Sequence, residues 1–85
     1  MRNIFREDLG KNIRKIRTEK HITQESLSLE ANVSRSHIAM IEAGKRDITI
    51  STLFQISRAL NVNLREIFSF DDTEKYKFDI EKYYQ

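Results

Sequence analysis

Residues 23–44 read TQESLSLEANVSRSHIAMIEAG, and this pattern predicts two short helices joined by a tight turn. The first helix is expected at Gln24–Ala31, because Leu27 and the final alanine are spaced to lie on one side of a helix. Ser34 can begin the second helix, since its hydroxyl can accept a hydrogen bond from backbone N–H groups that the first turn leaves unpaired. Gly44 can end it, because glycine readily adopts the left-handed backbone that closes a helix.

The second of these helices has an unusual outer face. Val33, Ile38 and Ile41 are expected to point inward, the last two at helical spacing. None of the residues on the opposite face is acidic. Such a face suits the major groove of DNA, which repels negative charge and accepts slender hydrogen-bond donors. The outward residues are Arg35, Ser36, His37, Ala39 and Met40.

The rest of the chain continues this pattern and predicts a compact all-α domain of five helices. Apolar residues recur at helical spacing both before and after residues 23–44. Residues suited to cap a helix N-terminus precede the last four helices: Thr23, Ser34, Thr49 and Asn63. The expected helices are Phe5–Lys20, Gln24–Ala31, Arg35–Ala43, Ile50–Leu60 and Leu64–Phe68.

Length and composition narrow the function classes. A chain of 85 residues makes one small domain with a marginal core, which gains from a partner subunit. It contains no cysteine, and it has no apolar run long enough for a membrane span or a signal peptide, so a cytoplasmic protein is expected. The net charge is only +2, yet residues 1–20 hold seven Lys and Arg against three acids. A basic body favours a polyanionic partner, although a solvated charged surface would have the same composition.

Four segments together resemble the phage repressor/Cro-like (XRE-type) family of helix-turn-helix DNA-binding proteins. They are LGKNIRKIR at 9–17, TQESL at 23–27, VSRSHIAMIEAGKR at 33–46 and TLFQISRALNVNLREIF at 52–68. No single segment is specific, but their order and spacing are. The resemblance implies a Cro/repressor-like five-helix fold over residues 1–70, with residues 71–85 as a C-terminal tail.

The chain departs from the family pattern at a few positions. The family usually has glycine at three helix ends that need left-handed backbone, and here these positions hold His21, Asn32 and Asn61. Asparagine and histidine tolerate that conformation better than most residues, so the geometry should be kept. Ser28 replaces a usual alanine and can bond back to the preceding turn. Ile48 replaces a frequent proline.

Four residues on the outer face are predicted to contact DNA bases. Arg35 is the strongest candidate, because an arginine can form two parallel hydrogen bonds to guanine. Its alternatives are a phosphate contact or a solvated side chain. The other candidates could touch a base edge or a thymine methyl group, with an ordinary surface role as their alternative: Ser36, Ala39 and Met40.

Six further residues are predicted to contact the DNA backbone. By the resemblance, Gln24 anchors to a phosphate, and its amide is expected to point outward beside the free N–H groups of its helix. Lys45 and Arg46 should add affinity and salt dependence without choosing a sequence. The remaining candidates are Thr23, Ser34 and His37, of which the histidine fits an ordinary surface role equally well.

Two structural features are also expected, the first from the resemblance and the second from the small size of the reading helix. The family often joins its first and third helices by an ion pair at the positions of Arg17 and Glu42, which would orient the DNA-reading helix. A homodimer is expected, because one short helix reads too few base pairs for specificity. The candidate interface residues, several of which must also build the core, are Ile48, Ile50, Phe54, Leu64, Phe68 and Phe70.

The tail 71–85 lies outside the resemblance. The alternation of Tyr76, Phe78 and Ile80 fits a strand, whereas Tyr76, Ile80, Tyr83 and Tyr84 fit one face of a helix, and periodicity does not choose between them. Its aromatic content favours packing on the body or on a second subunit over fraying.

These features predict a homodimeric transcription regulator that binds a palindromic operator in double-stranded DNA. Among small stand-alone members of the family, a restriction–modification controller is the first hypothesis, with phage repressors and antitoxins as the others. The alternative class is a protein-interaction module, such as an antitoxin, that binds a partner through the tail. An enzyme is not expected, because His21 and His37 lack an acid–nucleophile arrangement, and no metal or cofactor is expected.

Overall fold

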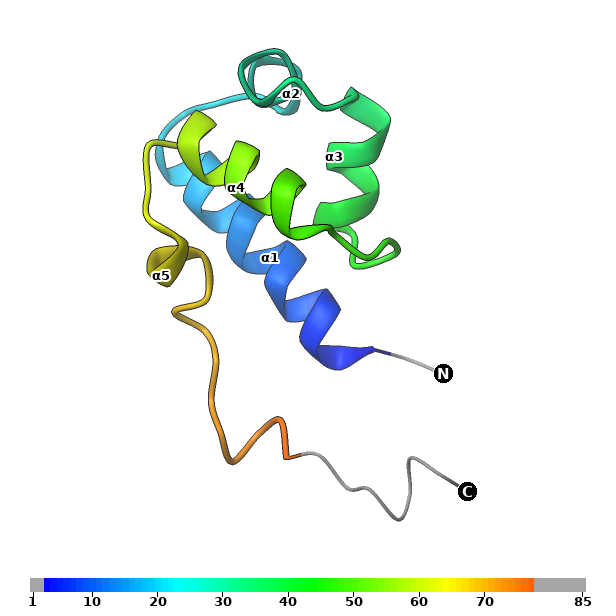
Figure 1. The fold of residues 1–85 in the computed structure, drawn as a ribbon, viewed down its shortest axis with the longest axis vertical. Helices are drawn as coiled ribbons and strands as arrows, with labels where there is room; N and C mark the ends of the chain where they lie inside the picture. Colours follow the sequence, from blue (N-terminus) through cyan, green and yellow to red (C-terminus); the bar gives the residue numbers. More distant parts are fainter. Residues whose placement is uncertain (1–2, 78–85) are drawn as a thin grey trace.

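The computed structural model describes residues 3–77, and this part of the chain folds into five α-helices with no strand (Figure 1). The five-helix fold predicted from the sequence is confirmed, and each helix boundary lies within one residue of its expected position. The helices are α1 (Ile4–Glu19), α2 (Gln24–Ala31), α3 (Arg35–Glu42), α4 (Ile50–Ala59) and α5 (Leu64–Ile67).

Side-chain caps explain where the helices begin. The predicted caps Thr23, Ser34, Thr49 and Asn63 each accept a hydrogen bond from the backbone N–H three residues later. Asn3 caps α1 in the same way. Each such bond satisfies one of the donors that a helix N-terminus leaves unpaired. The helix starts are therefore determined by contacts within one turn of the chain.

Left-handed residues explain how the helices end. His21, Asn32 and Asn61 have φ angles of 58°, 56° and 56°, as their replacement of the family glycines predicts. Gly44 follows α3 with a φ of 70°. The backbone can turn sharply at these positions and begin the next element in a new direction.

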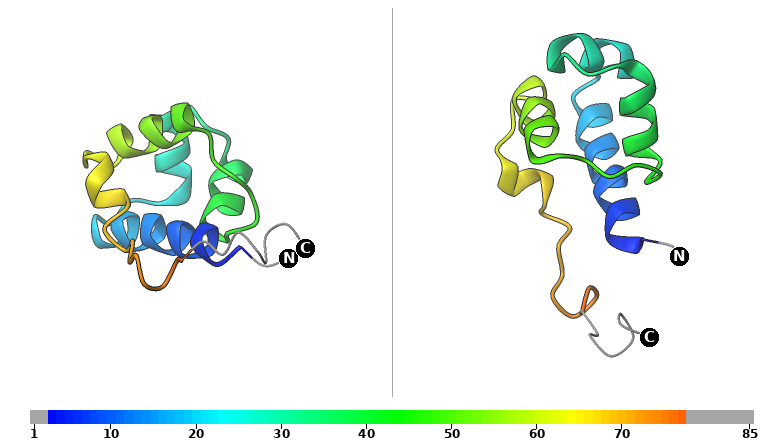
Figure 2. Two further views of the ribbon diagram at one scale, coloured as in Figure 1. Left: turned by 60° about the horizontal axis from the view of Figure 1, so that its bottom comes forward. Right: turned by 45° about the vertical axis from the view of Figure 1, so that its right-hand side comes forward.

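The helices form a closed ring around one core. Helix α1 packs against α3 and α5, α2 packs against α3 and α4, and α4 also packs against α5 (Figure 2). Ser28 lies buried between helices, and its hydroxyl donates to the Glu25 carbonyl at 2.7 Å, as expected. The buried apolar side chains are Leu9, Ile13, Leu27, Ala31, Ile38, Ile41, Leu53, Ile56, Leu60, Val62 and Ile67.

Residues 71–77 leave the ring and reach the N-terminal end of α1 (Figure 2). Tyr76 lies in a turn, so its own conformation is neither the strand nor the helix that the periodicity suggested. It packs on Phe5 and Phe70 of the body. The other residues of those two patterns, Phe78, Ile80, Tyr83 and Tyr84, lie outside the described residues. None of the helices within residues 3–77 is long and apolar enough to cross a membrane.

Candidate nucleic-acid interface

Helix α3 presents an outer face that carries no acid, on which Arg35 and Ser36 are exposed and the other residues are half-buried. Its buried side holds Ile38, Ile41 and Glu42. A rotation of about 100° per residue then places Ser36 and Met40 at the centre of the opposite side. The predicted base-contact residues Arg35 and Ala39 lie on one flank of this centre, and the predicted phosphate residue His37 lies on the other.

Two shallow hollows divide this face. One, of about 270 Å³, is lined by Ser34, Ser36, His37, Met40 and Arg46, and therefore brings five of the predicted DNA-binding residues together. The other, of about 370 Å³, lies along the turn between α2 and α3. Arg35 lines this second hollow, and Ser34 lines both, so the two hollows adjoin at the start of α3.

A buried ion pair holds the last turn of α3 against α1. The Arg17 guanidinium donates to both carboxylate oxygens of Glu42, with Nε–Oε2 and Nη2–Oε1 distances of 2.7 and 3.0 Å. A third bond runs from Arg17 Nη1 to the Ile22 carbonyl at 2.7 Å. This fork-to-fork geometry fixes the direction as well as the distance of the contact. The structure thus brings Arg17 and Glu42 together, at the end of the helix that presents the candidate DNA-binding face.

The expected orientation of Gln24 is wrong. Its side-chain amide turns inward and donates to Glu42 Oε1 at 3.0 Å, rather than pointing to solvent. The physical reason is that a buried carboxylate has lone pairs beyond those that Arg17 uses, and a nearby amide donor can satisfy one of them. The amide nitrogen still has a second hydrogen that could donate to a phosphate.

The predicted phosphate residues Thr23 and Ser34 are both engaged as helix caps. Thr23 Oγ1 accepts from the Ser26 N–H at 3.0 Å, and Ser34 Oγ accepts from the His37 N–H at 3.1 Å. A hydroxyl that accepts in this way keeps its own hydrogen for donation. Both residues stand at helix N-termini, where unpaired backbone N–H groups also favour an anion.

The loop after α3 carries the exposed residues Lys45 and Arg46 and is held by a residue that sequence reasoning missed. Arg6 Nε donates to the Gly44 carbonyl at 2.9 Å, and its Nη1 pairs with Asp47 Oδ1 at 3.2 Å. Arg6 therefore bonds the loop at both ends of the Lys45–Arg46 pair, two residues beyond the end of α3. Nothing in the spacing of Arg6 distinguishes it from the other basic residues of α1.

Gly10 was also missed, although the sequence did contain a signal. It is a buried glycine in the middle of α1, and a Cβ atom added there would lie 2.2 Å from the Ile41 carbonyl oxygen and 2.8 Å from that of Glu42. Glycine is unfavourable inside a helix, so one found there usually permits a close approach. Here the close approach is between α1 and the last turn of α3.

The predicted dimer-interface residues fall into two groups. Ile50 and Phe54 on α4 are 82% and 48% exposed, and the Arg58 guanidinium lies 4.7 Å from the Phe54 ring centre. The other four are partly buried against the core of the same chain: Ile48, Leu64, Phe68 and Phe70. Phe70 lies 5.2 Å from Phe5, measured between ring centres, and is thus used inside the described fold.

Known proteins provide an independent comparison. A helix-turn-helix family model matches residues 13–67. The chain is 37% identical over 67 residues to the control protein C.MunI of a Mycoplasma species, covering 78% of this chain and 88% of that protein. It is 34% identical over 71 residues to the control protein C.BamHI of Bacillus amyloliquefaciens, covering 82% and 88%.

A solved structure supports the same conclusion. The restriction–modification controller protein C.AhdI from Aeromonas hydrophila superposes with a TM-score of 0.72 at 29% identity, covering 73% of this chain and 94% of that chain. These relatives are regulators rather than enzymes. Since the family model covers more than half of the sequence, this chain belongs to the helix-turn-helix family of DNA-binding transcriptional regulators.

Proposed function

We propose that this protein is a homodimeric, sequence-specific transcriptional regulator of the restriction–modification controller type, acting on a palindromic operator. The observation that carries the proposal is the acid-free outer face of α3. Ser36 and Met40 lie at its centre, and the basic side chains of Arg35 and Arg46 flank it. The similarity to three controller proteins supports the choice within the family.

The proposed base contacts lie at the centre and along one flank of the outer side of α3. Arg35 has a guanidinium suited to guanine, and Ser36, Ala39 and Met40 offer small or flexible groups to base edges and thymine methyl groups. Phosphate contacts come from the helix N-termini, where Thr23, Gln24 and Ser34 stand, from His37, and from the loop that holds Lys45 and Arg46. In this division, the base contacts of α3 determine which DNA sequence is bound, and the surrounding phosphate contacts determine how strongly binding depends on salt.

The exposed apolar residues of α4 support the proposed dimer. Ile50 and Phe54 place apolar side chains in solvent, and Ile48, Ile50 and Phe68 help to line an adjacent hollow of about 290 Å³. A two-fold axis through this region would repeat α3, and half-sites about 34 Å apart would then double the base contacts. Like Ile48 and Phe68, the other two candidate interface residues, Leu64 and Phe70, are partly buried against the core of the same chain.

Selection from a pool of random DNA duplexes tests the function. Purified protein at near-physiological salt should enrich a two-fold-symmetric motif. On that motif Arg35→Ala should cost about 1–3 kcal/mol of binding free energy and relax one base position. Lys45→Ala should instead weaken binding to all DNA sequences alike, and should reduce by about one unit the slope of log affinity against log salt concentration. A folded protein that enriches no motif would favour the protein-interaction alternative.

Sedimentation equilibrium tests the dimer separately. Ile50→Glu and Phe54→Glu should both give a monomer, because a buried carboxylate without a partner is strongly unfavourable. Leu29→Glu is the matched control, since it changes an exposed leucine beside the turn between α2 and α3 in the same chemical way. A dimer that survives both α4 substitutions would exclude this interface.

A further inference from the structure

The first two turns of α1 are held from two sides. Phe5 and Asp8 are three residues apart and share one side of the helix, which contacts the tail. Arg6 and Glu7 lie on another side, which contacts the loop after α3. The tail and the loop after α3, which are far apart in the sequence, thus both contact one short stretch of α1.

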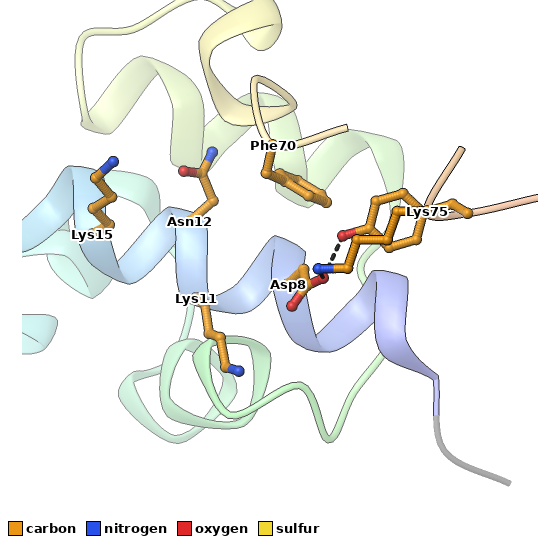
Figure 3. A pocket seen from close by; sticks show the side chains of 7 residues that line it. Asp8, Lys11, Asn12, Lys15, Phe70 and Lys75 are labelled. Carbon is orange, nitrogen blue, oxygen red and sulfur yellow. Dashed lines mark hydrogen bonds and ion pairs between the residues drawn. The ribbon is translucent and has the colours of Figure 1, made fainter. Parts of the chain in front are cut away.

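The tail contact combines an aromatic cluster with a polar one. The Tyr76 ring packs edge-on against Phe5, with 5.0 Å between ring centres, and against Phe70 at 6.1 Å. Its hydroxyl donates to Asp8, and Lys75 Nζ lies 2.8 Å from the same carboxylate oxygen (Figure 3). The bonds from Lys75 and Tyr76 hold the pKa of the Asp8 carboxyl below its usual range. Asp8 therefore stays ionised and keeps both partners at neutral pH.

The loop contact is equally close. Arg6 holds the Gly44 carbonyl and the Asp47 carboxylate, as described above. A Cβ atom on Gly44 would lie 2.7 Å from the Glu7 Cα, so loop and helix touch with no room for a side chain. Lys45 and Arg46, which we propose to bind phosphates, stand between these two held residues.

We propose that tail residues Lys75 and Tyr76, packed on Phe70 of the body, position the proposed phosphate-binding loop at Lys45 and Arg46, acting through the N-terminal turns of α1. The first turn of a helix frays readily, because its N–H groups have no intrahelical partners, and in α1 the Asn3 side chain satisfies one of them. The tail packs this turn, and the packed turn supplies Arg6 to the loop. The proposal rests on the DNA-binding function proposed above, since it concerns how the loop meets phosphate.

Loss of the tail contact is expected to weaken DNA binding without removing any DNA contact. An unheld loop must be ordered when DNA binds, and that ordering is unfavourable. In the full chain, Tyr76→Ala should weaken operator binding about threefold to tenfold, a usual range for coupling through packed side chains. Arg6→Ala should have a similar effect, and the two substitutions together should do little more than either alone.

A double-mutant cycle distinguishes positioning from a general loss of stability. Tyr76→Ala should change affinity less than about twofold when Lys45 and Arg46 are both alanine, because the loop then has no charge left to position. Lys75→Ala removes a tail contact to α1 and should weaken operator binding, as Tyr76→Ala does. Lys77→Ala is its charge-matched control, because Lys77 pairs with Glu74 inside the tail and should have little effect. Equal effects of Tyr76→Ala in both backgrounds would overturn the proposal.

Hydrogen exchange tests the link without DNA. The Gly44 and Lys45 amides donate to the Ile41 and Met40 carbonyls, and these bonds report whether the loop is ordered. Tyr76→Ala should speed exchange at both amides, and Tyr76→Phe, which removes only the hydroxyl, should do so more weakly. Faster exchange confined to residues 4–8 would overturn the proposal. Because this measurement needs no operator, a wild-type protein that fails to bind DNA would refute the proposed function and leave this result interpretable.

Discussion

Two arginines of α1 hold the end of α3, and they do so in very different surroundings. Arg17 and Glu42 have side chains that are 10% and 3% exposed, and Gln24 and the Ile22 carbonyl complete their hydrogen bonds. Arg6 and Asp47 have side chains that are 29% and 83% exposed. The first pair is part of the interior, whereas the second lies at the surface beside the loop.

The difference teaches that the same chemical pairing can serve two purposes. Breaking a buried pair leaves a charge with no water to solvate it, so the fold depends on the pair staying whole. An exposed pair contributes little to stability, because water and salt screen it. The end of α3 is thus fixed by a buried ion pair at Glu42, whereas the loop that follows it is held by a largely exposed ion pair at Asp47.

The largest effect is expected from Glu42→Ala. It leaves the Arg17 guanidinium buried with only the Ile22 carbonyl as a partner, and should lower the free energy of unfolding by about 3–5 kcal/mol. Urea denaturation followed by circular dichroism measures this. The combined Arg17→Met and Glu42→Leu variant is the control, because it removes both charges and should regain most of the loss. A loss below about 1 kcal/mol in Glu42→Ala would mean that the pair behaves as an exposed one.

Gly10→Ala should have the next largest effect. In a free helix this change is stabilising by about 0.5–1 kcal/mol, because glycine has more freedom to lose. Here the new Cβ would clash with backbone carbonyl oxygens of α3, so we expect a destabilisation of about 1–3 kcal/mol. The same denaturation experiment reads the sign directly. Arg14→Ala, at an exposed position of α1, should change stability by less than about 0.5 kcal/mol.

Arg6→Ala should change stability far less than Glu42→Ala. Its pair with Asp47 is exposed, so the free energy of unfolding should fall by only about 0.2–1 kcal/mol. The measurement is the shift of the urea midpoint at low and at high salt, and the small effect should shrink further in high salt. A loss as large as that of Glu42→Ala would erase the distinction between the two arginines.

The smallest effect is expected from acid. The pKa of Asp8 is lowered in the folded protein, so its contribution to stability is present above the unfolded value of about 3.9 and is lost as the pH falls through the folded value. The pKa of Lys75 is raised by its bond to Asp8, so this partner stays charged throughout. NMR should show the Tyr76 ring resonances shifting between pH 5 and pH 2, and Asp8→Asn should abolish that step. If the Tyr76 resonances still shift with pH in Asp8→Asn, the shift reports the titration of another carboxyl group.

The amino-acid sequence was sufficient for the helices. The caps at Thr23, Ser34, Thr49 and Asn63 act on N–H groups three residues away, and the left-handed turns at Asn32 and Asn61 act on the adjoining turn of helix. Because such interactions are local, residue type and spacing predict them, and each boundary lies within one residue of its expected place. Periodicity likewise identified the side of α3 that faces the core.

Only the tertiary structure decided which side chains that are far apart in the sequence form hydrogen bonds with each other. The Gln24 amide turns inward because the buried Glu42 carboxylate has a lone pair that Arg17 does not use, and this amide is a donor within reach of it. Arg6 reaches Gly44 across 38 residues of sequence, and Tyr76 reaches Asp8 across 68. Such contacts depend on the way the ring of helices closes, and local sequence patterns do not encode that closure. The helices therefore follow from short-range chemistry, whereas the contacts that hold the loop after α3 depend on which surfaces folding brings together.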